Sequence, residues 1–453
     1  MKADHHGHDC MQVPFPGDAA PLGTPPDEDC LVINVWRPAS AGDGKRPVMV
    51  WLYGGGFVNG GASPDVYDGS QFAKKGVILV SFNYRVGRFG FFAFPALTAE
   101  ARRLGEPVAN YGYMDQIAAL KWVQRNIAAF GGDKDNVTIF GESAGGGSVM
   151  NLLVSKAARG LFAKAIVESG GGRSSLMGDR GLDTPGPNGG PSAEEIGVNL
   201  AKKNGIEGTG ADALAALRAL PAETVLDGLN MATMRQAGDT YVGGPLADGD
   251  IMPGNQQALL ESGDHARVPV IIGANSADIG FSFAQSMEQV TRPFGTDAAA
   301  VLKAYDPEGT GDVRAVGSAI AMDQTMIEPA RFVVRTVSSQ GLPAYEYRFS
   351  YVADSMRDQW KGAPHATEIP YVFDTVAAKY GQDLTAKDAA IADMANSYWV
   401  NFARTGNPNG PGLPEWPAYS KANDTVMDFM MSGRPRAMAD PWKARLDLIE
   451  KHR

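Results

Sequence analysis

Apolar residues in this chain occur either as short continuous runs or at helical spacing, and the two patterns alternate. The short runs are rich in β-branched and aromatic side chains, which is typical of strands. Two of the runs, 47–53 and 76–84, are almost wholly apolar, as expected of strands that are covered on both faces. The predicted strands span residues 31–37, 47–53, 76–84, 136–141, 163–169 and 268–275.

A long amphipathic helix is predicted over residues 114–133. Its apolar side chains recur at helical spacing, and Gly131 and Gly132 mark its end. The apolar positions are Ile117, Leu120, Val123 and Ile127. A second helix is predicted after Ser143. Strands and helices that alternate in this way indicate an α/β fold with a mostly parallel, doubly wound central sheet.

The sequence changes character between about residues 172 and 245. A Gly- and Pro-rich stretch is followed there by short Ala- and Leu-rich segments with helical character. Because large α/β enzymes often form one sheet with insertions, we predict a single domain over residues 1–453 in which this segment is an inserted cap or lid. No internal repeat is visible.

Composition narrows the range of functions. The chain has 453 residues, of which 44% are hydrophobic and 20% are charged, as in a soluble protein with a large core. A net charge of −10 without clustered Lys and Arg argues against a nucleic-acid partner. No apolar run approaches the roughly 18 residues that a membrane span needs. The first ten residues also lack the apolar core of a signal peptide.

Cys10 and Cys30 are the two cysteines of the chain, and both lie in one segment rich in Pro and Gly. Two cysteines fit either one disulfide or two free thiols, and their spacing does not decide between these alternatives. The composition therefore leaves the redox compartment open.

Ser143 lies in the sequence Gly-Glu-Ser-Ala-Gly, between a predicted strand and a predicted helix. A G-x-S-x-G motif in that context is typical of a nucleophile elbow, in which small flanking residues let the backbone turn sharply. Chance occurrence is the alternative in a chain with 55 glycines, and the strand and helix on either side make it the weaker one. A dinucleotide-binding loop would need glycine where Ser143 stands.

A serine nucleophile needs a base, and histidine is the usual one. Five of the six histidines are poorly placed, because they lie in a polar run at the N-terminus, in a polar turn or beside the C-terminus (His5, His6, His8, His265 and His452). We interpret the N-terminal histidines as solvated and not as a metal site. His365 remains, in a loop late in the chain that follows a strand-like segment at 344–352. A surface or packing histidine is the alternative interpretation.

Gly54, Gly55 and Gly56 directly follow the apolar strand 47–53. Backbone N–H groups of glycines can approach a substrate oxygen closely, because no Cβ stands in the way. They are candidates for an oxyanion hole, and the alternative is an ordinary tight turn.

Several longer blocks of sequence occur in a specific order from Cys10 to beyond Tyr419. They are EDCLVINVWRP, VMVWLYGGGFVNG, VSFNYRVGRFGFF, NYGYMDQIAALKWVQRNIAAFGGDKDNVTIFGESAGG, VPVIIGANSAD, GAPHATEIPYVF and FARTGNPN with WPAY. In these blocks the chain resembles the type B carboxylesterases, the α/β-hydrolase branch that includes cholinesterases and bacterial p-nitrobenzyl and aryl esterases. The resemblance is weakest over residues 172–240.

The resemblance implies a role for particular residues. The family's nucleophile corresponds to Ser143 and its base to His365. The oxyanion hole corresponds to the N–H groups of Gly55, Gly56 and Ala144. The two family cysteines that close an early loop correspond to Cys10 and Cys30, so a disulfide between them is expected.

The third member of the triad departs from the family pattern. The family most often has a glutamate five residues after the glycine that corresponds to Gly273, followed by a glycine, whereas this chain has Asp278 followed by Ile279. The order Ser143, Asp278, His365 agrees with that of α/β-hydrolases. Glu368 is the competing carboxylate, and we interpret it as structural.

We therefore expect a serine carboxylesterase that hydrolyses uncharged aryl or short to medium alkyl esters through an acyl-enzyme. It would need no metal and no organic cofactor. The alternatives are a hydrolase of a lactone, carbamate or amide, and a non-catalytic binding protein like the cholinesterase-like adhesion proteins. The family's N-terminal strands have no counterpart here, so the chain is expected to be truncated or to lack them.

The expected partner is a small ester, and the expected assembly is a monomer or weak homo-oligomer without a membrane span. A disulfide between Cys10 and Cys30 would indicate a secreted or periplasmic protein, and free thiols a cytoplasmic one. The loop between these cysteines contains no tryptophan, and Phe15 is its only aromatic residue. Cholinesterases use a tryptophan there to hold the ammonium group of choline, so we expect no preference for charged esters.

Overall fold

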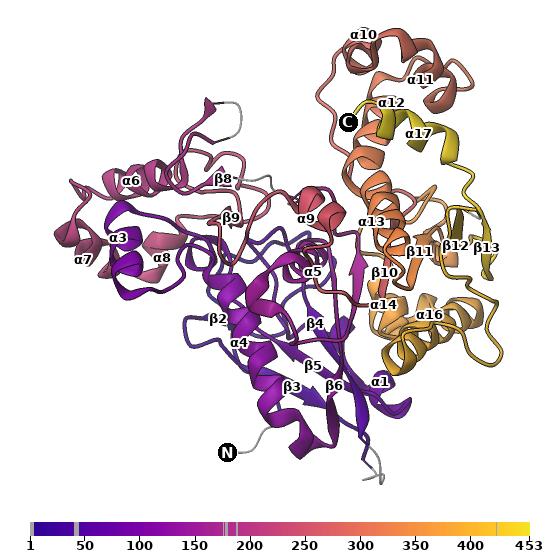
Figure 1. The fold of residues 1–453 in the computed structure, drawn as a ribbon, viewed down its shortest axis with the longest axis horizontal. Coiled ribbons are helices and arrows are strands. Elements are labelled where there is room, and N and C mark those ends of the chain that lie inside the picture. Colours follow the sequence, from indigo (N-terminus) through magenta and orange to yellow (C-terminus); the bar gives the residue numbers. More distant parts are fainter. Residues whose placement is uncertain (1–3, 40–44, 175, 177–179, 187–188, 423) are drawn as a thin grey trace. The chain divides into compact units, whose positions relative to one another are not determined.

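The computed structural model describes residues 4–39, 45–174, 176, 180–186, 189–422 and 424–453 (Figure 1). The chain forms two compact units, each assembled from two separate stretches. The first unit comprises Met1–Ile166 and Ser174–Arg267, and the second comprises Val167–Arg173 and Val268–Arg453. The chain first passes from one unit to the other within strand β7 (Lys164–Glu168).

The sheet of the first unit contains the predicted apolar strands. Its strands are β3 (Ile33–Trp36), β4 (Arg46–Leu52), β5 (Ile78–Phe82) and β6 (Gly132–Glu142). β4 pairs in parallel with both β5 and β6, and β3 pairs antiparallel to β5. All of β5 and the last five residues of β4 are buried, which confirms that these strands are covered on both faces.

The second unit contains β10 (Val270–Asn275), β11 (Ala344–Phe349), β12 (Thr425–Phe429) and β13 (Pro435–Ala439). β10 pairs in parallel with β11 and β11 with β12, whereas β13 is antiparallel to β12. In each unit's described strands, parallel pairs therefore predominate and the antiparallel pair lies at one edge. Shorter paired strands are β1 (Asp9–Cys10), β2 (Pro26–Asp27), β8 (Arg180–Gly181) and β9 (Leu246–Ala247).

Helices follow most of these strands (Figure 1). The first unit has α1 (Ser70–Lys74), α2 (Gly87–Gly90), α3 (Pro95–Leu104), α4 (Tyr111–Asn126), α5 (Ala144–Val154), α6 (Ala193–Lys203), α7 (Ala211–Arg218), α8 (Ala222–Leu226) and α9 (Gln256–Ser262). The second has α10 (Met287–Thr291), α11 (Ala298–Tyr305), α12 (Val313–Met322), α13 (Glu328–Ser339), α14 (Ile369–Val372), α15 (Val376–Tyr380), α16 (Ala386–Thr405) and α17 (Lys443–Lys451). None of the helices within the described residues is long and apolar enough to cross a bilayer.

The long helix predicted at 114–133 begins earlier and ends earlier than expected. α4 ends at Asn126, and the chain continues as a short 3-10 helix, Ile127–Phe130. Gly131 then takes a left-handed conformation with φ of 86°, which ends the helical run. Because this one glycine completes the turn, Gly132 already belongs to strand β6, and its assignment to the helix end was wrong.

The segment at 172–245 forms the short helices that were expected, α6 to α8. Residues 175, 177–179 and 187–188 of that segment lie outside the described residues. Apolar side chains of α6 and α7 pack in one cluster with Phe94, which precedes α3. The buried guanidinium of Arg88 donates hydrogen bonds to the carbonyls of Val225, Leu226 and Thr240 at 2.7–2.9 Å. Helices α6 to α8 are therefore fixed to the rest of the first unit by both apolar and polar contacts.

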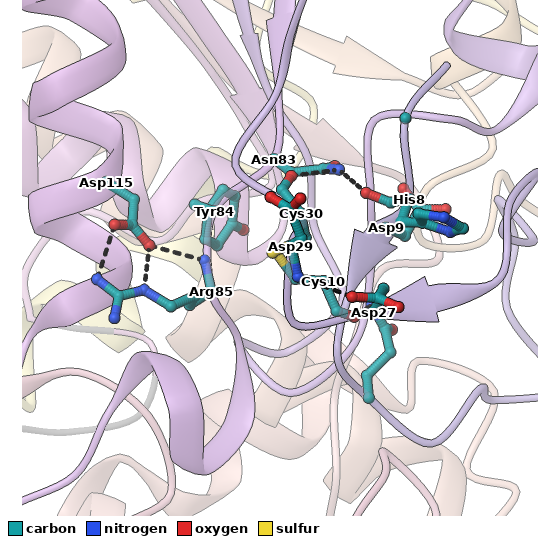
Figure 2. Close-up of a disulfide and its surroundings, with 12 residues drawn as sticks. His8, Asp9, Cys10, Asp27, Asp29, Cys30, Asn83, Tyr84, Arg85 and Asp115 are labelled. Carbon is teal, nitrogen blue, oxygen red and sulfur yellow. Dashed lines mark hydrogen bonds and ion pairs between the residues drawn. A yellow bond between two sulfur atoms is a disulfide. The ribbon is translucent and has the colours of Figure 1, made fainter. Parts of the chain in front are cut away.

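Cys10 and Cys30 form a disulfide, which decides between the two alternatives that composition left open (Figure 2). Both cysteines are buried. The side-chain amide of Asn83 donates to the carbonyls of His8 at 2.8 Å and Cys30 at 3.1 Å. These bonds hold the cross-linked segment against the residue that follows strand β5.

Candidate active site

Ser143 occupies the sharp turn between strand β6 and helix α5. Its φ of 56° and ψ of −121° are unfavourable for a residue with a side chain, so the surrounding contacts must hold the turn in place. A Cβ added at Gly141 would lie 2.6 Å from the carbonyl oxygen of Leu52, and one added at Gly145 would lie 2.0 Å from the same oxygen. Both glycines of the motif are therefore required, because the turn packs directly against the end of β4.

Ala144 is the first residue of α5, which has 11 residues. The N–H groups in the first turn of a helix have no acceptor within the helix and lie at its partially positive end. The N–H of Ala144 belongs to this set and directly follows Ser143. Such a donor can stabilise negative charge that develops beside the serine.

The glycine-rich loop after β4 lies against the same turn. A Cβ added at Gly54 would lie 3.1 Å from the Cβ of Ser143 and 2.9 Å from the carbonyl oxygen of Glu142. Gly55 and Gly56 have φ of 111° and 62°, conformations that favour glycine. The structure therefore places the loop that begins at Gly54 and continues through Gly55 and Gly56 against the Ser143 turn within the first unit.

Tyr53, the last residue before this loop, is fixed by a reciprocal pair of hydrogen bonds with Tyr84. The hydroxyl of Tyr53 donates to the carbonyl of Tyr84, and the hydroxyl of Tyr84 donates to the carbonyl of Tyr53, both at 2.6 Å. The rings stack with centroids 4.1 Å apart. Burial raises the pKa of both phenols, so they stay neutral and remain donors.

Asp278 and His365 form a hydrogen bond within the second unit. The Nδ1 atom of His365 lies 2.6 Å from Oδ1 of Asp278. We assign the proton to Nδ1 because its partner is a carboxylate. Asp278 also accepts bonds from the hydroxyl of Ser169 at 2.6 Å and from the N–H groups of Asn275 at 2.9 Å and Ile279 at 2.7 Å. The carboxylate is thus held on all sides.

The environment keeps Asp278 ionised. Its carboxyl group is fully buried, and burial alone would raise its pKa. The charge of His365 and the hydrogen bonds from His365 and Ser169 outweigh burial, so the pKa of Asp278 lies below its usual value. An ionised Asp278 can orient the His365 ring and stabilise its protonated form.

Glu368 occupies a different position in the same unit. It is fully buried and accepts a hydrogen bond from the side-chain amide of Asn275 at 2.5 Å. Burial and the nearby negative charge of Asp278 raise the pKa of Glu368 to about 7. Nδ1 of His365 bonds to Asp278, so the geometry favours Asp278 over Glu368 as the triad acid.

The sequence did not single out Ser169, although its hydroxyl bonds to Asp278. A polar residue at the carboxyl end of a buried strand, here β7, is the signal that could have identified it. Among the described residues, no group of three or more His, Cys, Asp or Glu side chains converges in a way that could hold a metal ion.

A sequence profile described as "Carboxylesterase family" matches residues 1–445 of the chain. The chain belongs to the carboxylesterase family. The fold is accordingly that of the α/β-hydrolases, and the chemistry of this family is the hydrolysis of carboxylic esters by an active-site serine.

Individual carboxylesterases are similar over most of the chain. A fumonisin B1 esterase of Sphingopyxis macrogoltabida is 33% identical over 419 residues, which cover 89% of this chain and 73% of that protein. An acylcarnitine hydrolase of Mus musculus is 35% identical over 426 residues, which cover 87% and 70%. A cocaine esterase of Homo sapiens is 34% identical over 440 residues, which cover 91% and 72%.

Proposed function

We propose that this carboxylesterase uses Ser143 as nucleophile, His365 as general base and Asp278 as the acid that orients the histidine. The observation that carries the proposal is the 2.6 Å hydrogen bond between His365 and Asp278. With its proton on Nδ1, the ring presents an unprotonated Nε2 that can accept a proton from a serine. The strained turn at Ser143 supports the choice of nucleophile, because strain of this kind is typical of functional sites.

The steps follow from these roles. Nε2 of His365 takes the proton of Ser143 as Oγ attacks the ester carbonyl. The N–H groups of Gly55, Gly56 and Ala144 stabilise the negative oxygen of the tetrahedral intermediate. The alcohol leaves with the proton from His365, and water then hydrolyses the acyl-enzyme by the same route. In this mechanism no metal or organic cofactor takes part.

We expect the protein to hydrolyse p-nitrophenyl acetate and to lose this activity after reaction with one equivalent of paraoxon. The reason is that an activated serine is phosphorylated once and the phosphoryl group stays on its Oγ. Release of p-nitrophenol measures the stoichiometry, and mass spectrometry of the digested protein locates the adduct, which should lie on Ser143. An adduct on another residue would contradict the assignment. Ester binding without any turnover would support the non-catalytic alternative.

The substrate class proposed is uncharged aryl or short to medium alkyl esters. The loop between Cys10 and Cys30 has no tryptophan to hold an ammonium group. A Cβ added at Gly56 would lie 3.4 Å from the sulfur of Met231, so an apolar side chain borders the proposed oxyanion hole. The disulfide supports an oxidising compartment as the place where the enzyme works.

We expect kcat/KM for 3,3-dimethylbutyl butyrate to equal or exceed that for butyrylcholine at about 0.15 M salt, where long-range attraction is largely screened. The two esters have similar shapes and differ in charge, so their ratio measures recognition of the cation. Repeating the measurement at low salt separates long-range attraction from contact. A tenfold preference for butyrylcholine, about 1.4 kcal/mol, would show that another group holds the cation.

A further inference from the structure

Gln12 lies two residues after Cys10 and is buried. Its side-chain amide donates to the carbonyl of Cys10 at 2.9 Å and to the carbonyl of Gly60 at 2.7 Å. Its oxygen accepts from the N–H of Gly60 at 2.9 Å and from the side chain of Asn59 at 3.1 Å. The amide therefore pairs with Gly60 as a neighbouring strand would, and both of its N–H groups and both lone pairs of its oxygen are used.

Asn59 and Gly60 form the far end of the glycine-rich loop. The N–H groups of Val58 and Asn59 donate to the carbonyl of Gly55 at 3.1 and 2.9 Å, which closes the loop on itself. A Cβ added at Gly60 would lie 2.3 Å from the carbonyl oxygen of Gly54, so the two ends of the loop meet. Hydrogen bonds that fix Asn59 and Gly60 consequently also restrain Gly55.

The glycines of this loop have no side chains that could pack against neighbours. Hydrogen bonds therefore have to fix the orientation of their backbone N–H groups. Asn59 is fully buried and links three segments of the first unit. Its amide donates to the carbonyl of Val13 at 2.8 Å as well as to Gln12, and its oxygen accepts from the N–H of Met231 at 2.9 Å. Gln12 and Asn59 together connect the loop to the cross-linked N-terminal segment.

The cross-linked segment is itself fixed from the other side. Asn83 donates to the carbonyl of Cys30 (Figure 2). It also accepts from the N–H of Ala62, close after the loop, at 2.8 Å. The Cys10–Cys30 disulfide thus lies between two sets of hydrogen bonds, one through Gln12 and one through Asn83.

We propose that Gln12 is a positioning residue of the oxyanion hole, through which the disulfide-bonded segment sets the direction of the Gly55 and Gly56 N–H groups. The inference rests on the proposed function, because it assumes that these groups bind the oxyanion. Donors that are already oriented stabilise the transition state without reorganisation, and removal of one such donor lowers kcat by roughly 10²- to 10³-fold. Without Gln12 the loop keeps its N–H donors, but these are no longer held in alignment. We therefore expect a loss of kcat smaller than that caused by removing a donor.

The test compares Gln12→Met with Gln124→Met. Methionine has a similar length but makes none of the amide's hydrogen bonds. Gln124 is a matched control, because its amide donates to the carbonyls of Lys134 at 2.8 Å and Leu161 at 2.9 Å, away from the loop. The readouts are kcat, KM and the Ki of a trifluoromethyl ketone, which forms a hemiketal with the serine and places a negative oxygen in the hole.

We expect Gln12→Met to lower kcat by about 10- to 100-fold and to raise this Ki by a similar factor, with KM changed by less than about threefold. Gln124→Met should leave all three values near those of the wild type. If Ser143→Ala is inactive, a folded Gln12→Met protein with wild-type kcat and Ki would overturn the inference. If Ser143→Ala is active, the proposed function fails instead.

Gln12→Glu decides the matter if Gln12→Met does not fold. A glutamic acid keeps the acceptor and, while protonated, one donor, and it loses that donor when it ionises. The activity of Gln12→Glu relative to the wild type should therefore be higher at pH 5 than at pH 8. A ratio independent of pH would contradict a role for the donated bond.

Discussion

Replacing Ser143 or His365 by alanine is expected to lower kcat by roughly 10⁴- to 10⁶-fold while the protein stays folded. Without Ser143 no acyl-enzyme can form, and without His365 the hydroxyl keeps its proton and remains a weak nucleophile. The two losses should be of similar size, since each removes the same step. Neither substitution leaves a void that the fold could not tolerate, because both side chains are partly exposed.

The measurement is kcat with saturating p-nitrophenyl acetate, together with circular dichroism to show that each variant is folded. Ser155→Ala is a matched control, because Ser155 is a buried serine at the other end of α5. It should retain activity close to that of the wild type. A tenth of wild-type activity in Ser143→Ala or His365→Ala would refute the corresponding assignment.

Asp278→Asn is expected to lower kcat by about 10²- to 10⁴-fold. An asparagine can present an N–H to Nδ1 of His365, which favours the tautomer with its proton on Nε2. That tautomer cannot accept the serine proton. The amide oxygen of the variant can still accept from the hydroxyl of Ser169 and the N–H of Asn275, which bond to the other carboxylate oxygen and hold the turn. The N–H of Ile279 loses its acceptor, because it bonds to the same oxygen as His365.

Glu368→Gln is the matched comparison for this change. Because the pKa of Glu368 is raised to about 7, its carboxyl is mostly protonated below pH 7, and glutamine has nearly the same shape as the protonated acid. The variant should therefore be close to wild type at pH 6. A crippled Glu368→Gln beside a nearly normal Asp278→Asn would mean that Glu368 is the triad acid.

The sequence predicted the parts of the fold that depend on local pattern. The apolar runs at 47–53 and 76–84 appear as β4 and β5, because a strand buried on both faces leaves a continuous apolar signal. The strand-like segment 344–352 appears as β11, whereas β12 and β13 were not among the predicted strands. β12 carries Asp428 and β13 carries Arg436, so neither is a clean apolar run.

In the site, too, the sequence predicted the residues that a local pattern identifies and missed those whose partners are distant in sequence. Ser143 could be recognised because the turn, its small neighbours and its flanking elements lie within a few residues of each other. Gln12 could not be recognised, because its partners Asn59 and Gly60 are 47 and 48 positions away. Nothing in the neighbouring sequence distinguishes it from any other buried glutamine. His265 was placed in a polar turn, whereas it is buried, because its neighbours in sequence do not reveal what packs over it.

The interleaved course of the chain has a consequence for its synthesis on the ribosome. Ser169 belongs to the short stretch Val167–Arg173 of the second unit, and its partner Asp278 follows 109 residues later. Translation proceeds at about 5 to 20 residues per second, so Asp278 is synthesised roughly 5 to 20 seconds after Ser169. During this interval the first unit can be completed as far as Arg267, while the segment around Ser169 still lacks the strands and helices it joins. The nucleophile turn is thus available to fold before any part of the acid and base pair exists.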